Sequence, residues 1–504
     1  MFKILLVKST TAYSKHTGTP PPLGIMYLAS YLSEKTQYAV RLFDARMYKE
    51  PVKEFYKLMS AYQPDIIGIS ALTLEAAYLH TISHIAKSID SHVKIVAGGP
   101  YPTSTPAKLM NDKNIDVGVI GEGEVTFKEL LDTYEYDGDL HNIRGIVFKS
   151  YDGIISTPAR PYIEMLDSLP YPAWNLIDLD AYFRRRGMST IGIRRYMTIF
   201  TSRGCPFHCT YCHNIMGKKF RARSVDNVLE EMRILREKYD IKDFEIIDDI
   251  SNFDRERFKQ ILRGIVGREW GVTLSFPNGV RTDMLDEEII HLMKKAGTSE
   301  LSVAIETASS RLQKLVKKNL HLEKIKRMIE IAVKDGIFVR GFFMLGFPTE
   351  TEEELKATID FACGSQLHGA IFFKVNPFGG TELYKQAYET GKLPADTHTS
   401  NFDYYATSFN LSDLSNAKFN RLYTKAYLRF YFSPRRIISI LRAKKIWNDL
   451  FLLGLRVIEI SFIGIFKKNK QLEPVDINIV YPAHKRMKEN IFYLKDKEKK
   501  RNTL

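Results

Sequence analysis

Short apolar runs alternate with longer, more polar stretches through the first quarter of the chain. The runs cover residues 4–7, 40–43, 66–69, 93–97 and 117–120. Each gap between them leaves room for a helix, a spacing typical of a parallel, doubly wound sheet. Residues 1–135 are therefore predicted to form a Rossmann-like α/β domain, with ligands expected beyond the carboxyl ends of its strands.

A second alternating series predicts a further α/β unit over residues 191–385. Its six apolar runs cover residues 197–201, 244–249, 273–276, 300–305, 339–346 and 370–375. Six β/α units form a partial barrel that is open at one side, and the functional groups again lie at the carboxyl ends of the strands. Residues 136–190 are predicted to be a linker, because Pro170 and Pro172 oppose regular structure there.

The last region, residues 386–504, is predicted to be mainly helical and carries most of the net charge of +14. Residues 450–466 are strongly apolar but contain Arg456 and Glu459, and they are too few for a membrane span of about 20 residues. Two interpretations stay open for this stretch. It is either a helix at the membrane interface or a helix packed on the barrel mouth with a solvated basic tail.

Composition and cysteine usage place the chain in a reducing compartment. With 44% hydrophobic and 26% charged residues, it can bury sizeable cores. The chain opens directly on a strand, so no secretory signal is predicted. Four cysteines in 504 residues do not form a disulfide framework, and free thiols favour the cytoplasm.

Three of the four cysteines, Cys205, Cys209 and Cys212, lie in one short loop after an apolar run. Iron–sulfur cubanes normally take four thiolates, so three would leave one iron open for chemistry. A zinc site that adds His213 is the alternative. It is disfavoured because all four candidates crowd one loop and two of them are adjacent. Cys363 stands apart and is interpreted as a small apolar residue.

This loop resembles the signature of radical S-adenosylmethionine (SAM) enzymes. The resemblance implies that the three thiolates hold a [4Fe-4S] cluster and that the amino and carboxylate groups of SAM bind the fourth iron. It also implies further SAM or substrate contacts after the barrel strands and beside the last cysteine, at Tyr211, Asp248, Asp249, Glu306 and Gly346. A helix N-cap for one of the aspartates, or an ion pair for Glu306 or Asp248, remains the structural alternative.

Glycine-rich strand ends upstream of the cysteines resemble the cobalamin-binding domain of cobalamin-dependent radical SAM enzymes. The matching segments, in order, are Pro20 to Ile25, Asp44, Gly98-Gly99-Pro100 and Gly121-Glu122-Gly123-Glu124. The resemblance implies cobalamin, contacted by Gly98, Gly99, Gly121, Glu122 and Gly123. The Asp-x-His-x-x-Gly loop of many cobalamin domains is absent, so no bond from histidine to cobalt is expected. Tight turns without a ligand, or a domain that has lost the cofactor, are the alternatives.

The family resemblance implies reductive cleavage of SAM to a 5′-deoxyadenosyl radical and, as the first hypothesis, cobalamin-dependent methylation of an unactivated carbon. Radical oxidation or ring closure, as in the anaerobic porphyrin cyclases that the chain also resembles, is the second. The expected partners are a small-molecule or lipid substrate, a low-potential donor such as flavodoxin or ferredoxin, and the inner membrane face through peripheral contact. A third reading, a zinc-bearing protein that binds nucleic acid through its basic end, leaves both α/β series unexplained.

Overall fold

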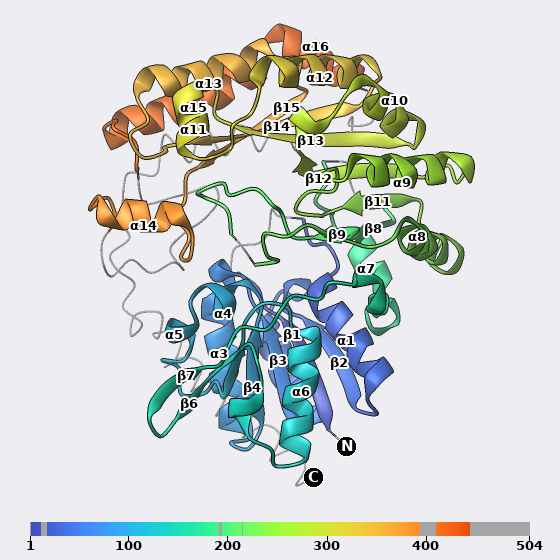
Figure 1. Cartoon of the computed structure of the whole chain (residues 1–504), viewed down its shortest axis with the longest axis vertical. Coiled ribbons are helices and arrows are strands. Elements are labelled where there is room, and N and C mark those ends of the chain that lie inside the picture. The colour runs from blue at the N-terminus through green and yellow to red at the C-terminus, as the bar shows by residue number, and fades with distance from the viewer. Residues whose placement is uncertain (1, 12–17, 191–193, 214, 394–409, 444–504) are drawn as a thin grey trace, which may run out of the picture.

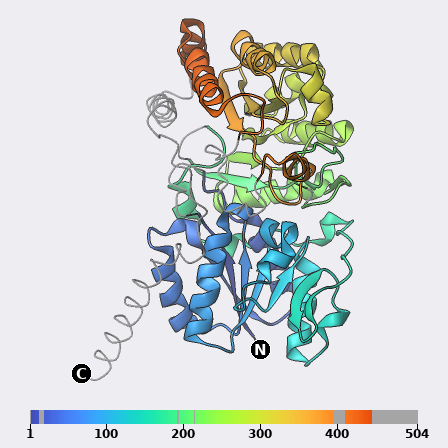
Figure 2. The same ribbon diagram turned by 90° about the vertical axis from the view of Figure 1, so that its left-hand side faces the viewer.

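The computed structural model describes residues 2–11, 18–190, 194–213, 215–393 and 410–443. Two α/β units are stacked along the long axis of the molecule, and both views show the same arrangement (Figures 1 and 2). None of the helices in the described ranges has the length and apolar character that a membrane span needs. The apolar stretch at residues 450–466 lies outside the described residues.

The first unit is a seven-stranded sheet in the order β2-β1-β3-β4-β5-β6-β7. Its strands are β1 (Lys3–Lys8), β2 (Ala39–Asp44), β3 (Ile66–Ser70), β4 (Lys94–Gly98), β5 (Val117–Val119), β6 (Ile146–Ser150) and β7 (Gly153–Ser156). The pairs among β1 to β5 are all parallel, which confirms the predicted doubly wound architecture. Alternate residues of β1 enter two different cores, Ile4 and Leu6 on one face and Leu5 and Val7 on the other.

Helices cover both faces of this first sheet. They are α1 (Leu23–Lys35), α2 (Pro51–Tyr62), α3 (Ala76–Ile89), α4 (Pro100–Ser104), α5 (Pro106–Leu109) and α6 (Glu124–Glu135). Leu32 of α1 and Leu130 of α6 pack in one core, whereas Phe55 of α2 and Leu79 of α3 pack in the other. The fold therefore has helices on both sides of a mostly parallel sheet.

The hairpin β6–β7 differs from the sequence prediction, because residues 146–156 fall within the predicted linker. Both strands extend the first sheet by antiparallel pairing, β6 against β5 and β7 against β6. Ile146, Val147 and Phe148 are buried in this pairing. The irregular connection begins only after this hairpin and includes the short helix α7 (Leu179–Phe183).

The second unit is a six-stranded, entirely parallel sheet in the order β15-β14-β13-β12-β11-β8. Its strands are β8 (Tyr196–Ile199), β11 (Asp243–Ile246), β12 (Thr273–Val280), β13 (Thr298–Glu306), β14 (Phe338–Leu345) and β15 (Gly369–Lys374). The edge strands β8 and β15 do not pair with each other, so the barrel is open. The predicted partial (β/α)6 barrel is confirmed.

Helices α8 to α13 follow the barrel strands, and in the described ranges three further helices come after β15. The first group is α8 (Val225–Tyr239), α9 (Arg255–Gly267), α10 (Glu287–Lys295), α11 (Ser310–Leu315), α12 (Leu322–Lys334) and α13 (Glu352–Gly364). The second is α14 (Glu382–Glu389), α15 (Asn416–Tyr431) and α16 (Pro434–Arg442). The hydroxyl groups of Tyr423 and Tyr427 donate to the carbonyl of Phe372, which fixes α15 against β15.

The two units share buried surface as well as a connection. Leu23, Met26 and Tyr27 of α1 belong to the core that is otherwise built by the barrel. The Tyr196 hydroxyl donates to the carbonyl of Thr19 at 3.3 Å. The carboxyl ends of the first sheet therefore face the barrel across a packed boundary, where the cysteine loop lies.

Candidate functional site

The cysteine loop is closed at its base by a short antiparallel ladder. Strand β9 (Ser202–Arg203) precedes the loop and pairs with β10 (Arg221–Ala222), which follows it. Inside the loop, the backbone N–H of Cys205 donates to the carbonyl of Gly217 at 3.2 Å. The ladder thus presents the three cysteines at the boundary between the two units.

Gly204 is required for this loop by both conformation and space. Its φ of +82° lies in the left-handed region, which side chains other than glycine rarely adopt. A Cβ atom there would overlap the carbonyl oxygen of Lys219 and lie 2.9 Å from that of Met216.

We expect Gly204→Ala to distort the loop and to reduce the iron content of the reconstituted protein. The left-handed backbone alone costs about 1–3 kcal/mol for a residue with a side chain. Gly267→Ala is the control, because Gly267 ends α9 without a positive φ and a Cβ atom there meets nothing within 4 Å. Iron analysis and thermal unfolding of both variants test this, and equal iron content would contradict it.

The three thiols of the loop are free and influence one another. Cys205 and Cys209 are half-buried, whereas Cys212 reaches the surface. Desolvation by the surrounding protein raises the pKa of the Cys212 thiol to about 11. The positive charge of Lys218 lowers this pKa, whereas Asp249 and the two other cysteines raise it further. No three His, Cys, Asp or Glu side chains in the described residues already surround one metal-sized point. Three neighbouring thiols on one partly open loop fit a cubane, which is larger than a single ion.

Tyr211, which lies within this loop, and Glu306, which ends β13, were both predicted as cofactor contacts and lie close together. Burial raises the pKa of Tyr211 well above its usual value, and the nearby Glu306 carboxylate adds to the shift. The ring of Tyr211 packs against Phe347 with the centroids 6.0 Å apart. Glu306 ends β13 with a φ of +67° and pairs with Lys318 at 3.3 Å. Such backbone in a residue other than glycine clusters at functional sites.

The two predicted aspartates at the end of the second barrel strand have different surroundings. Asp248 is buried and accepts hydrogen bonds from the backbone and hydroxyl of Thr201 and from the Ser202 hydroxyl. Asp249 is exposed, and its negative charge adds to the rise in the pKa of the Cys205 and Cys212 thiols. The N-cap alternative is wrong for both, because Asp254 caps α9. As a cofactor contact, Asp248 stays a prediction.

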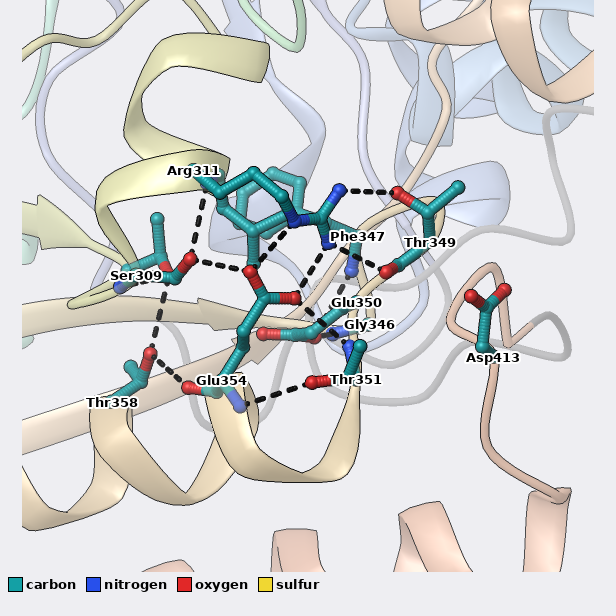
Figure 3. A network of polar contacts seen from close by, with 12 residues as sticks. Ser309, Arg311, Gly346, Phe347, Thr349, Glu350, Thr351, Glu354, Thr358 and Asp413 are labelled. Atoms are coloured by element: carbon teal, nitrogen blue, oxygen red, sulfur yellow. Dashed lines mark hydrogen bonds and ion pairs between the residues drawn. The ribbon is translucent and has the colours of Figure 1, made fainter.

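Gly346 begins a turn after β14 that is held by hydrogen bonds to Glu350, a residue that was not predicted from the sequence (Figure 3). The carboxylate Oε2 of Glu350 accepts from the backbone N–H of Gly346 at 2.5 Å and of Phe347 at 3.2 Å. Neighbouring Glu354 is the residue that pairs with Arg311, at 2.6 Å. The other oxygen of Glu350, Oε1, is buried and has no hydrogen-bond partner in the described residues.

Burial raises the pKa of Glu350 to about 8, so this carboxyl is protonated at neutral pH. The unfolded carboxyl ionises near 4.5, and the folded protein keeps its proton until about pH 8. The stability that this group contributes is therefore complete below pH 4.5 and is lost as the pH rises to 8, by roughly 1 kcal/mol per pH unit.

We expect Glu350→Gln to remove this pH dependence while keeping the hydrogen bonds to the turn. The free energy of unfolding of the variant, relative to that of wild type, should therefore increase as the pH is raised from 5 to 8. Urea unfolding followed at both pH values measures the difference. Glu353→Gln, at an exposed position in the first turn of α13, should show no such trend. An unchanged pH dependence in Glu350→Gln would show that the carboxyl is ionised throughout.

The predicted cobalamin glycines lie at the strand ends of the first sheet that face the barrel. Gly99 and Gly121 have φ values of +90° and +83°, so both require glycine. A Cβ atom at Gly98 or Gly123 would meet nothing within 4 Å. The backbone here borders open space at the carboxyl ends of parallel strands, which fits the approach of a large flat cofactor.

Glu122, in contrast, is used within the protein. Its Oε1 accepts from Arg203 at 2.9 Å, and both of its oxygens accept from Arg221 at 2.9 Å. Arg203 also binds Glu124 at 2.7 Å. All four side chains are buried. We call this group of four residues the interdomain clamp, because it joins the strand-end loop of the first sheet to the base of the cysteine loop.

The arginines of the clamp were missed by the sequence analysis. The signal available in the sequence was two arginines that flank the cysteine loop, together with two glutamates in an otherwise glycine-rich turn. Arg203 and Arg221 are direct partners in the β9–β10 ladder, which places both guanidinium groups on one side. The contact of Glu122 with these two arginines becomes visible only in the three-dimensional structure, where β9 and β10 pair.

Comparisons with known proteins agree with this architecture. Residues 11–131 match the B12 binding domain, and residues 199–362 match the radical SAM superfamily. An uncharacterised methyltransferase of Pyrococcus horikoshii is 33% identical over 448 residues, which are 87% of this chain and 94% of that protein. The cytidylyl-2-hydroxyethylphosphonate methyltransferase of Streptomyces wedmorensis is 28% identical over 480 residues, which are 83% of this chain and 89% of that protein.

A solved structure shares the fold across both units. The cobalamin-dependent SAM radical enzyme OxsB, with aqua-cobalamin and SAM bound, superposes with a TM-score of 0.70 at 17% identity. The match covers 98% of this chain and 80% of OxsB. Family membership favours the iron–sulfur interpretation of the cysteine loop over zinc. The chain belongs to the cobalamin-dependent methyltransferase branch of the radical SAM superfamily.

Proposed function

We propose that this enzyme methylates an unactivated carbon of a small-molecule substrate and that Cys205, Cys209 and Cys212 hold its [4Fe-4S] cluster. The observation that carries the proposal is the interdomain clamp, which fixes the cysteine loop against the strand-end loop of the B12-binding domain. When bound, the cluster, SAM and cobalamin supply the electron, the radical and the transferable methyl group.

The residues of this chain would position these groups and exclude water. We propose that Tyr211, Asp249, Glu306 and the Gly346 turn contact SAM or substrate. Tyr211 lies within the cysteine loop, and the other three lie at the carboxyl ends of β11, β13 and β14. Asp248 supports Thr201 and Ser202 just ahead of the loop. Burial of this boundary between two units keeps competing reactants from a reactive site.

For the first unit, we propose that Gly98, Gly99, Gly121 and Gly123 form the backbone surface on which cobalamin lies. This surface carries no histidine in the sequence position that binds cobalt in many relatives of the domain, so no histidine–cobalt bond is expected. Glu122 is assigned to the clamp in place of a cofactor contact.

We also propose domain limits near residues 156, 190 and 385. The first limit moves from 135 to 156 because β6 and β7 belong to the first sheet. Radical SAM enzymes act on a substrate with the help of a reductant. Flavodoxin or ferredoxin in the cytoplasm is the proposed donor, and the basic region after residue 386 is proposed to contact the inner membrane face peripherally.

The test is anaerobic purification with added cobalamin, followed by incubation with SAM carrying a deuterated methyl group, a strong reductant and extracted small molecules. Methyl transfer predicts that 5′-deoxyadenosine and S-adenosylhomocysteine form together and that deuterium enters one product. A product that loses hydrogen without gaining the label would favour oxidation or ring closure. A colourless protein that does not cleave SAM would overturn both schemes.

A further inference from the structure

A large cavity lies at the end of the barrel opposite the cysteine loop. Its volume is about 1080 Å³, and it is bordered by α16 and by the first residues of three strands, Thr273, Thr298 and Phe338. The strands are parallel, and the cysteine loop follows the carboxyl end of β8, so the two sites occupy opposite edges of the sheet. Helix α16 accordingly lies at the end of the molecule far from the boundary between the units (Figure 1).

The charges around this cavity are of one sign. Its described lining contains four cationic side chains, Lys294, Arg435, Arg436 and Arg442, and no Asp or Glu. None of the four contacts a carboxylate within the described ranges. Lys294 donates only to the carbonyl of Gly336, at 3.2 Å. The concentration of uncompensated cations in a concave site attracts anions.

Arg436 is a buried guanidinium that lacks an acidic partner. Its residue is 6% exposed, and its NH2 donates to the carbonyls of Cys363 and Ser365 at 3.1 and 2.9 Å. The guanidinium packs over the ring of Phe430 at 4.2 Å. Its Nε has no hydrogen-bond partner in the described residues, and neither has Oγ1 of buried Thr298, which lines the same cavity. Buried donors without acceptors cost free energy, which a bound anion would recover.

The mouth of the cavity adds an apolar surface. Phe432, Ile437 and Ile438 at the junction of α15 and α16 are 60%, 43% and 48% exposed, and Ile438 also lines the cavity. Arginine guanidinium groups match the oxygens of phosphate in a fork geometry. A ligand with a phosphate group and an apolar part could bind the arginines inside the cavity and pack on the apolar side chains at its mouth.

We propose that this cavity binds the phosphate group of an amphiphilic ligand, with the head group of an anionic phospholipid as its occupant. The site is separate from the cofactor site, so the proposal does not depend on the reaction that the enzyme catalyses.

The test compares the full-length holoenzyme with two variants of the cavity and two matched controls. R435Q/R442Q removes two charges from α16, and K294Q removes one from the last turn of α10. R421Q/K425Q on the exposed side of α15 and K295Q on α10 remove the same charges outside the cavity. These controls are needed because the sequence beyond residue 443 is itself basic.

Binding is measured by co-sedimentation with phosphatidylcholine vesicles containing phosphatidylglycerol, and by thermal unfolding with glycerol 3-phosphate. R435Q/R442Q should bind the anionic vesicles about thirtyfold more weakly than R421Q/K425Q does, at about 1 kcal/mol for each charge. K294Q should likewise bind more weakly than K295Q.

Two results distinguish the source of the phosphate. Loss of vesicle binding confined to the cavity variants supports the lipid. Thermal protection by glycerol 3-phosphate that these variants lose, without a difference on vesicles, supports a soluble phosphate ester in the same cavity. Equal behaviour of cavity and control variants in both assays overturns the proposal.

Discussion

Serine in place of Cys205, Cys209 or Cys212 is expected to reduce SAM cleavage to background and to lower the iron and sulfide content of the anaerobic protein. The thiolate is the ligand that iron–sulfur clusters use, and two remaining thiolates on this loop leave a second iron of the cubane without a protein ligand. The visible absorption of the cluster, its iron and sulfide content, and 5′-deoxyadenosine formed with dithionite measure the effect.

Two further variants separate ligand loss from a general effect on the fold. Cys363→Ser is the matched control, because this cysteine is on α13, away from the loop, and should keep full iron and activity. His213→Ala tests the zinc alternative. The His213 ring packs against Phe378, with the centroids 5.3 Å apart, which is a structural contact. A Cys212→Ser protein that keeps its iron, beside a His213→Ala protein that loses it, would show that the ligand assignment is wrong.

Most of the fold could be predicted because parallel sheets leave a strong local pattern. The strands of both units are buried on two faces, so they read as short continuous apolar runs separated by helices. Residues 66–69 and 370–375, for example, fall within or beside β3 and β15. The hairpin β6–β7 was missed because β7 has only two apolar residues, Ile154 and Ile155, and is largely exposed, so it lacks the longer apolar run that marks a buried strand.

The candidate site was predictable only where its chemistry is local in sequence. Three cysteines on one loop are visible as a spacing, whereas the partners of Asp248 and Glu122 are set by tertiary structure. A carboxylate after a strand reads as a ligand contact whether it faces a cofactor, two hydroxyl groups or a pair of arginines. Glu122 is the clearest case, because its partners are 81 and 99 residues away.

The second large effect is expected for Glu122→Gln, which should slow methyl transfer while leaving the content of each cofactor nearly unchanged. Removing the charge leaves Arg203 and Arg221 buried with a weakened partner, a change that typically costs about 3–5 kcal/mol when a buried pair is broken. Arg221 is also held by the carbonyls of Ile163 and Met216, so the loop itself should persist. The Glu122→Gln substitution should instead loosen the position of the cysteine loop relative to the first sheet.

Loss of position predicts a specific kinetic result. Cofactors that react in sequence need a defined separation, and a displacement of about 1 Å can cost about a hundredfold in rate. Glu122→Gln should therefore cleave SAM at a near-normal rate, yet release far less methylated product for each 5′-deoxyadenosine. Glu129→Gln is the control, since Glu129 pairs with Arg160 at a half-exposed position and should lose less than about 1 kcal/mol of stability.

Cobalamin affinity decides between the clamp and the role that the sequence suggested for Glu122. If Glu122 binds cobalamin, its substitution should weaken cobalamin binding and leave SAM cleavage coupled to methyl transfer in whatever fraction is loaded. If it belongs to the clamp, Arg221→Gln should reproduce the uncoupling, and the double variant should lose little more than either single one, because both changes break the same contact. Additive losses in the double variant would show that the two residues act separately and would contradict the clamp.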